Sequence, residues 1–191
     1  YTSYCDDYFV LSLDGRGDAL SGAISIFENW GIKILHEINA LHSLGHFYSA
    51  ITVCLGFKAV KHEGKITGLA AYAKPDANLL KKFKKLIWID SKSGSPISTL
   101  FTGGAYGPYP YADAKRYSSK LSELIKKYSN EVVASTAQFH LEESVKKLIQ
   151  FWSIKTKKNS VMLSGGVFAN VKLNQKISEI SHIKKVVVHP G

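Results

Sequence analysis

Residues 160–174 read SVMLSGGVFANVKLN, and this stretch predicts a strand, a glycine turn and a helix in succession. Ser160 to Leu163 is a short buried strand, Ser164-Gly165-Gly166 is a sharp turn, and a helix is expected from Asn170 to Ile180. Glycines leave the backbone N–H groups of such a turn open to a ligand, and a helix N-terminus favours an anion or a polar nucleotide edge. The stretch predicts either a nucleotide-binding turn or a tight connection that serves packing alone.

Two asparagines lie at the start of that expected helix. Asn170 and Asn174 are four residues apart, so both side chains fall on one helix face. We expect their amides to offer hydrogen-bond donors and acceptors to a ligand from that face.

The rest of the chain alternates between strand-like and helical segments. Three β-prone segments come first and predict an antiparallel meander: Phe9 to Leu13, Gly22 to Phe27 and Ile32 to Ile38. Helices are expected at Ser43 to Phe57, Asp76 to Leu86, Ser118 to Tyr128 and Glu131 to Trp152, and further strands at Leu86 to Asp90 and Lys185 to His189. This order predicts an α/β fold with a mixed sheet flanked by helices, and it suits one lobe of an actin-like, ribonuclease-H-like ATPase domain.

Three local features refine this order. Ser43 is expected to cap the helix that follows it. Lys61 to Lys65 is polar and broken by Gly64, which predicts a loop. Residues 91–117 are rich in Gly, Pro, Ser and Tyr, which predicts an insertion or a mobile loop.

The stretch VLSLDGRGD, residues 10–18, allows two interpretations. Arg16-Gly17-Asp18 spells the tripeptide that cell-adhesion receptors bind. Asp14-Gly15 at the end of an apolar run is instead typical of a strand that brings a carboxylate and a glycine turn to a phosphate. The chain has only two cysteines, which favours a reducing compartment and counts against the adhesion interpretation.

Composition and charge limit the class of protein. The 191 residues are 45% hydrophobic and 21% charged, which predicts a globular chain of one domain or two small lobes. No apolar run approaches the roughly 20 residues that span a bilayer, so we expect a cytoplasmic protein without a membrane anchor. The net charge of +10 suggests a polyanion partner, but the lysines form pairs on expected helix surfaces without an aromatic stacking pattern. We therefore interpret the lysines as solvated helix faces and do not expect nucleic-acid binding.

Several strings, taken in order, resemble one enzyme family. They closely resemble the O-carbamoyltransferases that include the nodulation protein U and the cephalosporin and tobramycin carbamoyltransferases. The strings cover the chain apart from a variable, insertion-like segment at about 76–130. They are His42 to Ala50, Leu55-Gly56-Phe57, Glu63 to Tyr72 and Leu163 to Asn174.

The resemblance implies an actin-like domain related to the tRNA threonylcarbamoyladenosine synthases. Members of the family use carbamoyl phosphate and ATP to make carbamoyl-adenylate, and then transfer the carbamoyl group to an acceptor hydroxyl of a small molecule. The actin-like domain performs the transfer around a divalent metal, usually taken as iron.

The same resemblance implies roles for residues of the two glycine turns. Asp14 matches a family aspartate that binds the metal, and Gly15 and Gly17 match the turn that faces the phosphate. Three residues match the turn on the adenosine side: Gly165, Gly166 and Asn170. Under this interpretation the adhesion tripeptide is a coincidence of spelling.

Two further strings carry expected site residues. Glu63, Gly64 and Lys65 match a family string, in which Lys65 would pair with a phosphate and Glu63 would meet a ribose hydroxyl. The alternative for these residues is a surface loop with a weak local ion pair. His42 matches a family histidine that would orient or deprotonate the acceptor hydroxyl, and the alternative is a histidine that caps the following helix.

Residues 1–191 are expected to be part of a longer actin-like domain. The family's paired metal histidines match a position upstream of Tyr1, and a further metal aspartate follows the segment that matches residues 188–191. A second domain of the threonylcarbamoyl-AMP-synthase type is also absent from the chain, so we expect this piece to be inactive by itself. Two alternatives stay open: a nucleotide- or tRNA-binding module, and a structural piece without a ligand.

Overall fold

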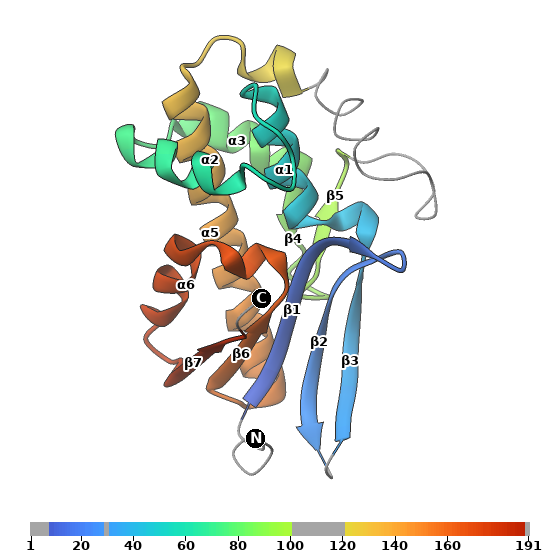
Figure 1. Ribbon diagram of the computed structural model, residues 1–191. Coiled ribbons are helices and arrows are strands. Elements are labelled where there is room, and N and C mark those ends of the chain that lie inside the picture. Colours follow the sequence, from blue (N-terminus) through green and yellow to red (C-terminus); the bar gives the residue numbers. More distant parts are fainter. Residues whose placement is uncertain (1–7, 29–30, 101–120, 190–191) are drawn as a thin grey trace.

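The computed structural model describes residues 8–28, 31–100 and 121–189 of the chain. A five-stranded sheet forms its centre, built from β1 (Tyr8–Gly17), β2 (Leu20–Glu28), β3 (Gly31–Asn39), β6 (Ser160–Ser164) and β7 (Lys185–Val188). A small antiparallel pair, β4 (Ile87–Ile89) with β5 (Pro96–Ser98), lies apart from it. Figure 1 shows the long strands of the sheet at one end of the molecule and a group of helices at the other.

The strand order of the sheet is β3-β2-β1-β6-β7. Strand β2 runs antiparallel to both β1 and β3, whereas β1, β6 and β7 run parallel to one another. The antiparallel meander and the mixed sheet that the sequence predicts are therefore confirmed. One antiparallel strand in second place, with the remaining four parallel, is the ribonuclease-H-like arrangement expected of an actin-like ATPase domain.

Helices pack around this sheet and above it. They are α1 (Leu44–Cys54), α2 (Glu63–Leu69), α3 (Ala77–Leu86), α5 (Asn130–Thr156) and α6 (Val171–Ser178), and residues 121–125 are also helical. Short 3₁₀ turns join them: η1 (Ala40–His42), η2 (Ala70–Tyr72) and η3 (Gly166–Ala169). The expected helix at 118–128 is described only from residue 121 onward. Of the expected loop at 91–117, only residues 91–100 are described, and they include the strand β5.

The long helix α5 connects the two ends of the molecule. It runs from the group formed by α2 and α3 down alongside the sheet (Figure 1). Near its end, Trp152 is 1% exposed and lies against His36 of β3, with 5.6 Å between the ring centroids. Strand β1 contributes Phe9, Leu11 and Leu13 to the same hydrophobic core, because alternate residues of a strand face the same side.

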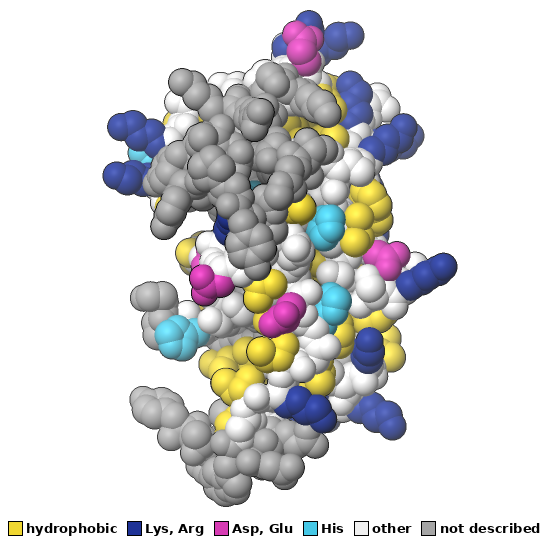
Figure 2. All heavy atoms as spheres, turned by 90° about the vertical axis from the view of Figure 1, so that its right-hand side faces the viewer, with side chains coloured by type: hydrophobic (Ala, Val, Ile, Leu, Met, Phe, Trp, Pro, Cys, Tyr) yellow, Lys and Arg dark blue, Asp and Glu magenta, His cyan; other side chains and the backbone are white. Residues whose placement is uncertain are grey.

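Strand β3 is an edge of the sheet and leaves Ile32 and Ile34 exposed. On the face shown in Figure 2, Lys and Arg side chains are scattered among hydrophobic, acidic and histidine side chains outside the grey atoms. Four lysines of α3 are likewise exposed on that helix surface, as the sequence predicts: Lys81, Lys82, Lys84 and Lys85. No helix within the described ranges is both long enough and apolar enough to cross a bilayer.

Candidate functional site

The candidate site lies where the parallel strands β1 and β6 end side by side. Their last paired residues are Ser12 and Ser164, so Asp14 and the turn Gly165-Gly166 leave the sheet at the same edge. A Cβ added at Gly166 would lie 3.1 Å from Oδ1 of Asp14, which shows how closely the carboxylate approaches this glycine. The two sequence motifs, about 150 residues apart, thus meet at the carboxyl ends of adjacent parallel strands, where α/β folds commonly bind ligands.

A bulge in β1 pushes Asp14 out of the sheet. Leu13 pairs with Gly22 and Gly17 pairs with Leu20, so three residues of β1 oppose a single residue of β2. Within the bulge, the Gly15 N–H donates a hydrogen bond to Oδ1 of Asp14 at 2.7 Å. Asp14 is exposed, which leaves its carboxylate open to a ligand.

Gly17 lies beyond this bulge, not in a turn that begins at Gly15. It forms the last pair of the β1–β2 hairpin, and the hairpin turn follows at Asp18 and Ala19, whose φ angles are 49° and 63°. Strand β1 therefore extends four residues past the expected end at Leu13. Contact of Gly17 with a phosphate stays a prediction.

The N-terminus of α1 supports the Asp14 bulge from the other side. Ser43 accepts a hydrogen bond from the His46 N–H at 3.0 Å and donates one to the Asp14 carbonyl at 2.9 Å. A Cβ added at Gly45 would lie 2.7 Å from that same carbonyl oxygen, so only a glycine allows this approach. The predicted cap at Ser43 is confirmed, and it holds the bulge as well as the helix.

Gly165 is the residue that permits the second turn. Its φ of +95° is unfavourable for residues with a side chain, and a Cβ there would overlap the carbonyl group of Leu13. Gly165 and Gly166 are both exposed, so backbone atoms of the turn are accessible to a ligand. The turn continues as η3, and α6 begins at Val171, one residue after the start that the sequence predicts.

Asn170 is used inside the protein. It is the N-cap of α6, where its Oδ1 accepts a hydrogen bond from the Leu173 N–H at 3.0 Å. Its Nδ2 donates to Oε1 of Gln138 in α5 at 2.8 Å. Asn174 similarly donates from Nδ2 to the Phe168 carbonyl at 2.7 Å. The two amides therefore hold the turn from behind, and their side-chain contact with a nucleotide stays a prediction.

The string Glu63-Gly64-Lys65 begins helix α2, so the expected loop at Lys61 to Lys65 is wrong in its last three residues. Oε1 of Glu63 accepts hydrogen bonds from the Ser49 hydroxyl at 2.7 Å and from the Val60 N–H at 2.6 Å. Lys65 is exposed, and its Nζ lies 5.8 Å from the centroid of the Phe57 ring. Glu63 thus fixes the α1–α2 connection, while the nucleotide contacts of all three residues stay predictions.

His42 ends the 3₁₀ turn η1, immediately before the α1 cap. Its Nδ1 accepts a hydrogen bond from the Ser98 N–H of β5 at 3.1 Å. In a neutral imidazole with an accepting Nδ1, the proton is on Nε2. Ser43, not His42, caps α1, so the capping alternative for His42 is wrong.

The resemblance also implies that Asp14 binds a metal ion, which would need further His, Cys, Asp or Glu side chains close to Asp14. Within residues 8–28, 31–100 and 121–189, no three His, Cys, Asp or Glu side chains are close enough together to hold a metal ion. A carboxylate without such companions does not make a metal site by itself. We therefore assign no chemical step to a metal.

Buried polar groups lie behind the site, and burial shifts their pKa values. Burial raises the pKa of the Tyr48 phenol in α1, and it also raises the pKa of the Glu142 carboxyl in α5. Both side chains bond to Gln138, which is 5% exposed. The sequence did not predict three supporting contacts, because each joins residues that are distant in the chain. They are the hydrogen bond from Ser43 to the Asp14 carbonyl, the approach of Gly45 to that carbonyl, and the hydrogen bonds of Gln138.

Comparison with known proteins shows the family of this chain. A family model described as the carbamoyltransferase N-terminus matches residues 2–191. An uncharacterized protein of Methanocaldococcus jannaschii is 32% identical over an alignment of 180 positions, which covers 89% of this chain and 32% of that protein. A second uncharacterized protein of the same organism is 29% identical over an alignment of 198 positions, which covers 95% of this chain and 30% of that protein. The chain thus spans about a third of the length of these curated relatives.

Among solved structures, the chain is similar to component A of (R)-2-hydroxyglutaryl-CoA dehydratase from Acidaminococcus fermentans. The identity is 15%, the TM-score is 0.49, and the match covers 98% of this chain and 57% of that one. The match of the family model over residues 2–191 is what assigns the family. This chain belongs to the carbamoyltransferase family and matches the N-terminal part of its members.

Proposed function

We propose that this chain is part of an O-carbamoyltransferase. The enzyme would make carbamoyl-adenylate from carbamoyl phosphate and ATP, and then transfer the carbamoyl group to a hydroxyl of a small-molecule acceptor. The observation that carries the proposal is the meeting of Asp14 with Gly165-Gly166 at the ends of β1 and β6, in a chain of the carbamoyltransferase family.

The two turns have separate parts in this proposal. The exposed turn Gly165-Gly166 receives the adenosine side of the nucleotide, because glycines let a ligand approach the main chain. The start of α1, which packs on Gly15 through Gly45, places the positive end of a helix dipole beside the phosphate side. Departure of AMP would be favoured by these backbone groups, since they are already oriented before the negative charge develops.

His42 is proposed to orient the acceptor, not to deprotonate it. Its Nδ1 is occupied by the Ser98 N–H, so the neutral ring presents a proton on Nε2. A ring in this state donates a hydrogen bond to an oxygen and has no free lone pair with which to remove a proton. Orientation of the acceptor hydroxyl or of the carbamoyl carbonyl is the role that this state permits.

The contacts of Lys65, Glu63 and Asp14 limit which of their atoms could bind the nucleotide or the metal. Lys65 is exposed and would pair with a phosphate. Glu63 already uses Oε1 to hold the α1–α2 connection, so a ribose contact would have to use Oε2. Asp14 would supply one carboxylate to the family's metal, expected to be iron, and no step is assigned to that ion.

The nucleotide part of the proposal is tested by calorimetric titration of the chain with ADP. Gly166→Trp is expected to remove binding, because the indole would fill the space beside the Asp14 carboxylate. Gly68→Trp is the size-matched control, since its Cβ would meet open space on the exposed α2 surface. Binding by the control but not by Gly166→Trp supports the proposal, and equal binding by all three chains refutes the location.

Transfer itself is tested with the complete gene product. Labelled carbamoyl phosphate, ATP and a panel of hydroxylated small molecules are incubated with the protein, and the products are separated by chromatography. The proposal expects ATP-dependent label on an acceptor, and less of it with Asp14→Asn. Salt-sensitive binding of tRNA, without any ATP-dependent transfer, would favour the nucleic-acid module instead.

A further inference from the structure

Gln138 is a buried amide that joins three helices behind the candidate site. It lies on α5 and is 5% exposed. Its Oε1 accepts hydrogen bonds from the Tyr48 hydroxyl of α1 at 2.7 Å and from Nδ2 of Asn170, the cap of α6, at 2.8 Å. Its Nε2 donates to Oε1 of Glu142 at 2.8 Å and to Oδ1 of Asn170 at 3.3 Å. All the hydrogen-bonding atoms of the amide are therefore used.

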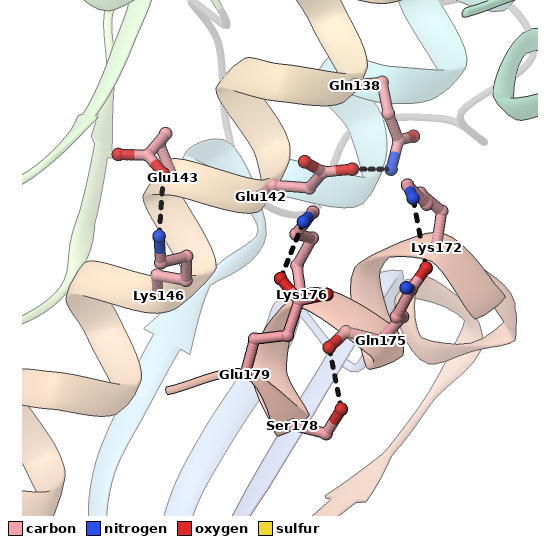
Figure 3. A network of polar contacts seen from close by, with 9 residues as sticks. All are labelled: Gln138, Glu142, Glu143, Lys146, Lys172, Gln175, Lys176, Ser178 and Glu179. Carbon is pink, nitrogen blue, oxygen red and sulfur yellow. Dashed lines mark hydrogen bonds and ion pairs between the residues drawn. The ribbon is translucent and has the colours of Figure 1, made fainter. Parts of the chain in front are cut away.

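The partners of Gln138 fix which end of its amide faces which neighbour. Oδ1 of Asn170 must accept from the Leu173 N–H at the helix cap, so its Nδ2 is the donor that faces Gln138. Glu142 lies at the other end and offers an acceptor to Nε2 (Figure 3). A rotation of the amide by 180° would place donor against donor and acceptor against acceptor. The Gln138 side chain is thus held in one orientation.

The three bonded helices carry both halves of the candidate site. Asn170 follows η3, which begins at Gly166, so the Gln138–Asn170 pair holds the end of the glycine turn. Tyr48 lies one turn after Gly45, at which α1 packs on the bulge of Asp14 and Gly15. The Tyr48 hydroxyl also lies 3.1 Å from Oγ1 of Thr67 in α2, the helix that begins at Glu63. Through Asn170 and Tyr48, this one amide is therefore linked to the end of the glycine turn, to the helix that packs on the Asp14 bulge, and to α2.

We propose that Gln138 is a positioning residue for the nucleotide, which sets the Gly165-Gly166 turn relative to the Asp14 bulge through its bonds to Asn170 and Tyr48. This inference rests on the proposed function, because it assigns a role in that same site. Gln138 acts through Asn170 and Tyr48 and is not a catalytic residue. The distance between the two turns, and hence the affinity for a nucleotide that spans them, depends on the bonds of Gln138 to Asn170 and Tyr48.

The first test compares variants that change the network with one that removes an equivalent bond elsewhere on α5. Gln138→Glu loses the donor to Asn170 and Glu142, and the milder Tyr48→Phe loses only the phenol oxygen. The matched control is Ser135→Ala, which removes a buried hydroxyl that bonds the Ala73 carbonyl at 2.9 Å. ADP affinity is measured by calorimetry at a temperature at which circular dichroism shows every variant folded.

Gln138→Glu is expected to weaken ADP binding about tenfold, and Tyr48→Phe about threefold, because the turns lose their fixed separation. Ser135→Ala is expected to lower the melting temperature and leave the affinity unchanged. The double variant Gln138→Glu/Tyr48→Phe should weaken ADP binding by a smaller factor than the product of the factors for the two single variants. Both substitutions act through the Gln138 amide, so their effects are not independent. Equal affinity of Tyr48→Phe, Gln138→Glu and Ser135→Ala would overturn the inference.

The second test does not depend on a nucleotide. Amide hydrogen exchange is followed at Phe168, whose N–H bonds the Gly165 carbonyl, and at Leu173, whose N–H bonds Asn170. Gln138→Glu should speed exchange at both amides about tenfold, and Ser135→Ala should not. If the unaltered chain binds no ADP, the proposed function fails while the exchange rates still decide the role of Gln138. Unchanged exchange at both amides overturns the inference by itself.

Discussion

Gly165→Ala is the substitution whose cost the structure defines most fully. At φ +95° and ψ 164°, Gly165 occupies a region of backbone space that residues with a Cβ rarely adopt. Such a conformation costs about 1–3 kcal/mol for a residue other than glycine. The new Cβ would also lie 2.8 Å from the carbonyl carbon of Leu13 and closer still to its oxygen.

The clash adds to the strain because the neighbouring atoms cannot move cheaply. Leu13 lies in β1, the central strand, which is hydrogen-bonded to β2 on one side and β6 on the other. Overpacking of this kind costs about 1–3 kcal/mol. The two effects together predict a loss of about 4 kcal/mol in the free energy of unfolding, which corresponds to about 8–16 °C in melting temperature for a chain of this size.

The assay is thermal unfolding followed by circular dichroism, with Gly68→Ala as the matched control. Gly68 lies in helix α2, and its Cβ would meet open space. Alanine is favoured over glycine in a helix by up to about 1 kcal/mol, so this control should melt at the same temperature or a few degrees higher. If Gly165→Ala melted within about 2 °C of the unaltered chain, the described turn and its approach to Leu13 would be incorrect.

Three further predictions concern buried titratable groups and a close backbone contact. Burial lowers the pKa of His140 to about 4, so protons bind the unfolded chain first as the pH falls, and stability should drop by about 2 kcal/mol between pH 7 and pH 5. His140→Gln should lack this loss in urea titrations at the two pH values. Burial raises the pKa of Glu142, so the folded chain binds this proton more tightly than the unfolded chain does. The contribution of Glu142 to the free energy of unfolding is therefore favourable below the ordinary carboxyl pKa and is lost as the pH rises. Glu142→Gln should therefore be more stable than the unaltered chain at pH 8, and the difference should narrow toward pH 4, which the same urea titrations check. Gly45→Ala should destabilise the chain by about 1–3 kcal/mol and also weaken ADP binding in calorimetry, because its Cβ would meet the Asp14 carbonyl; an affinity equal to that of the unaltered chain would contradict the proposed support of the bulge.

The fold was predictable from the sequence because its elements have strong local patterns. The apolar run Phe9 to Leu13 and the amphipathic stretch Glu131 to Trp152 lie within β1 and α5, and Ser43 caps α1 as expected. Boundaries failed where the local signal was absent. Helix α2 begins at Glu63, but His62 makes no side-chain cap that could have marked this start. Ile66, which is fully buried, anchors the helix in the core.

The candidate site was predictable in its glycines and not in its supports. Asp14, Gly165 and Gly166 follow strand-like runs, so their positions at the sheet edge follow from local pattern together with parallel pairing. Gln138 bonds with Tyr48 and Asn170, which lie 90 and 32 residues away, and no local pattern encodes such partners. Asn170 was expected to face a ligand because the local pattern does not show that its amide bonds the Leu173 N–H and Gln138.

We propose above that Asp14 and the Gly165-Gly166 turn form one nucleotide-binding site. The most direct measurement is a titration of the isotope-labelled chain with ADP, followed through the backbone amide signals in NMR spectra. If the two turns bind one nucleotide, the largest shifts occur together at Gly15, Gly165 and Gly166, with smaller shifts on the exposed lysine surface of α3. Largest shifts on α3, or no shifts at the two turns in a folded chain, would contradict it.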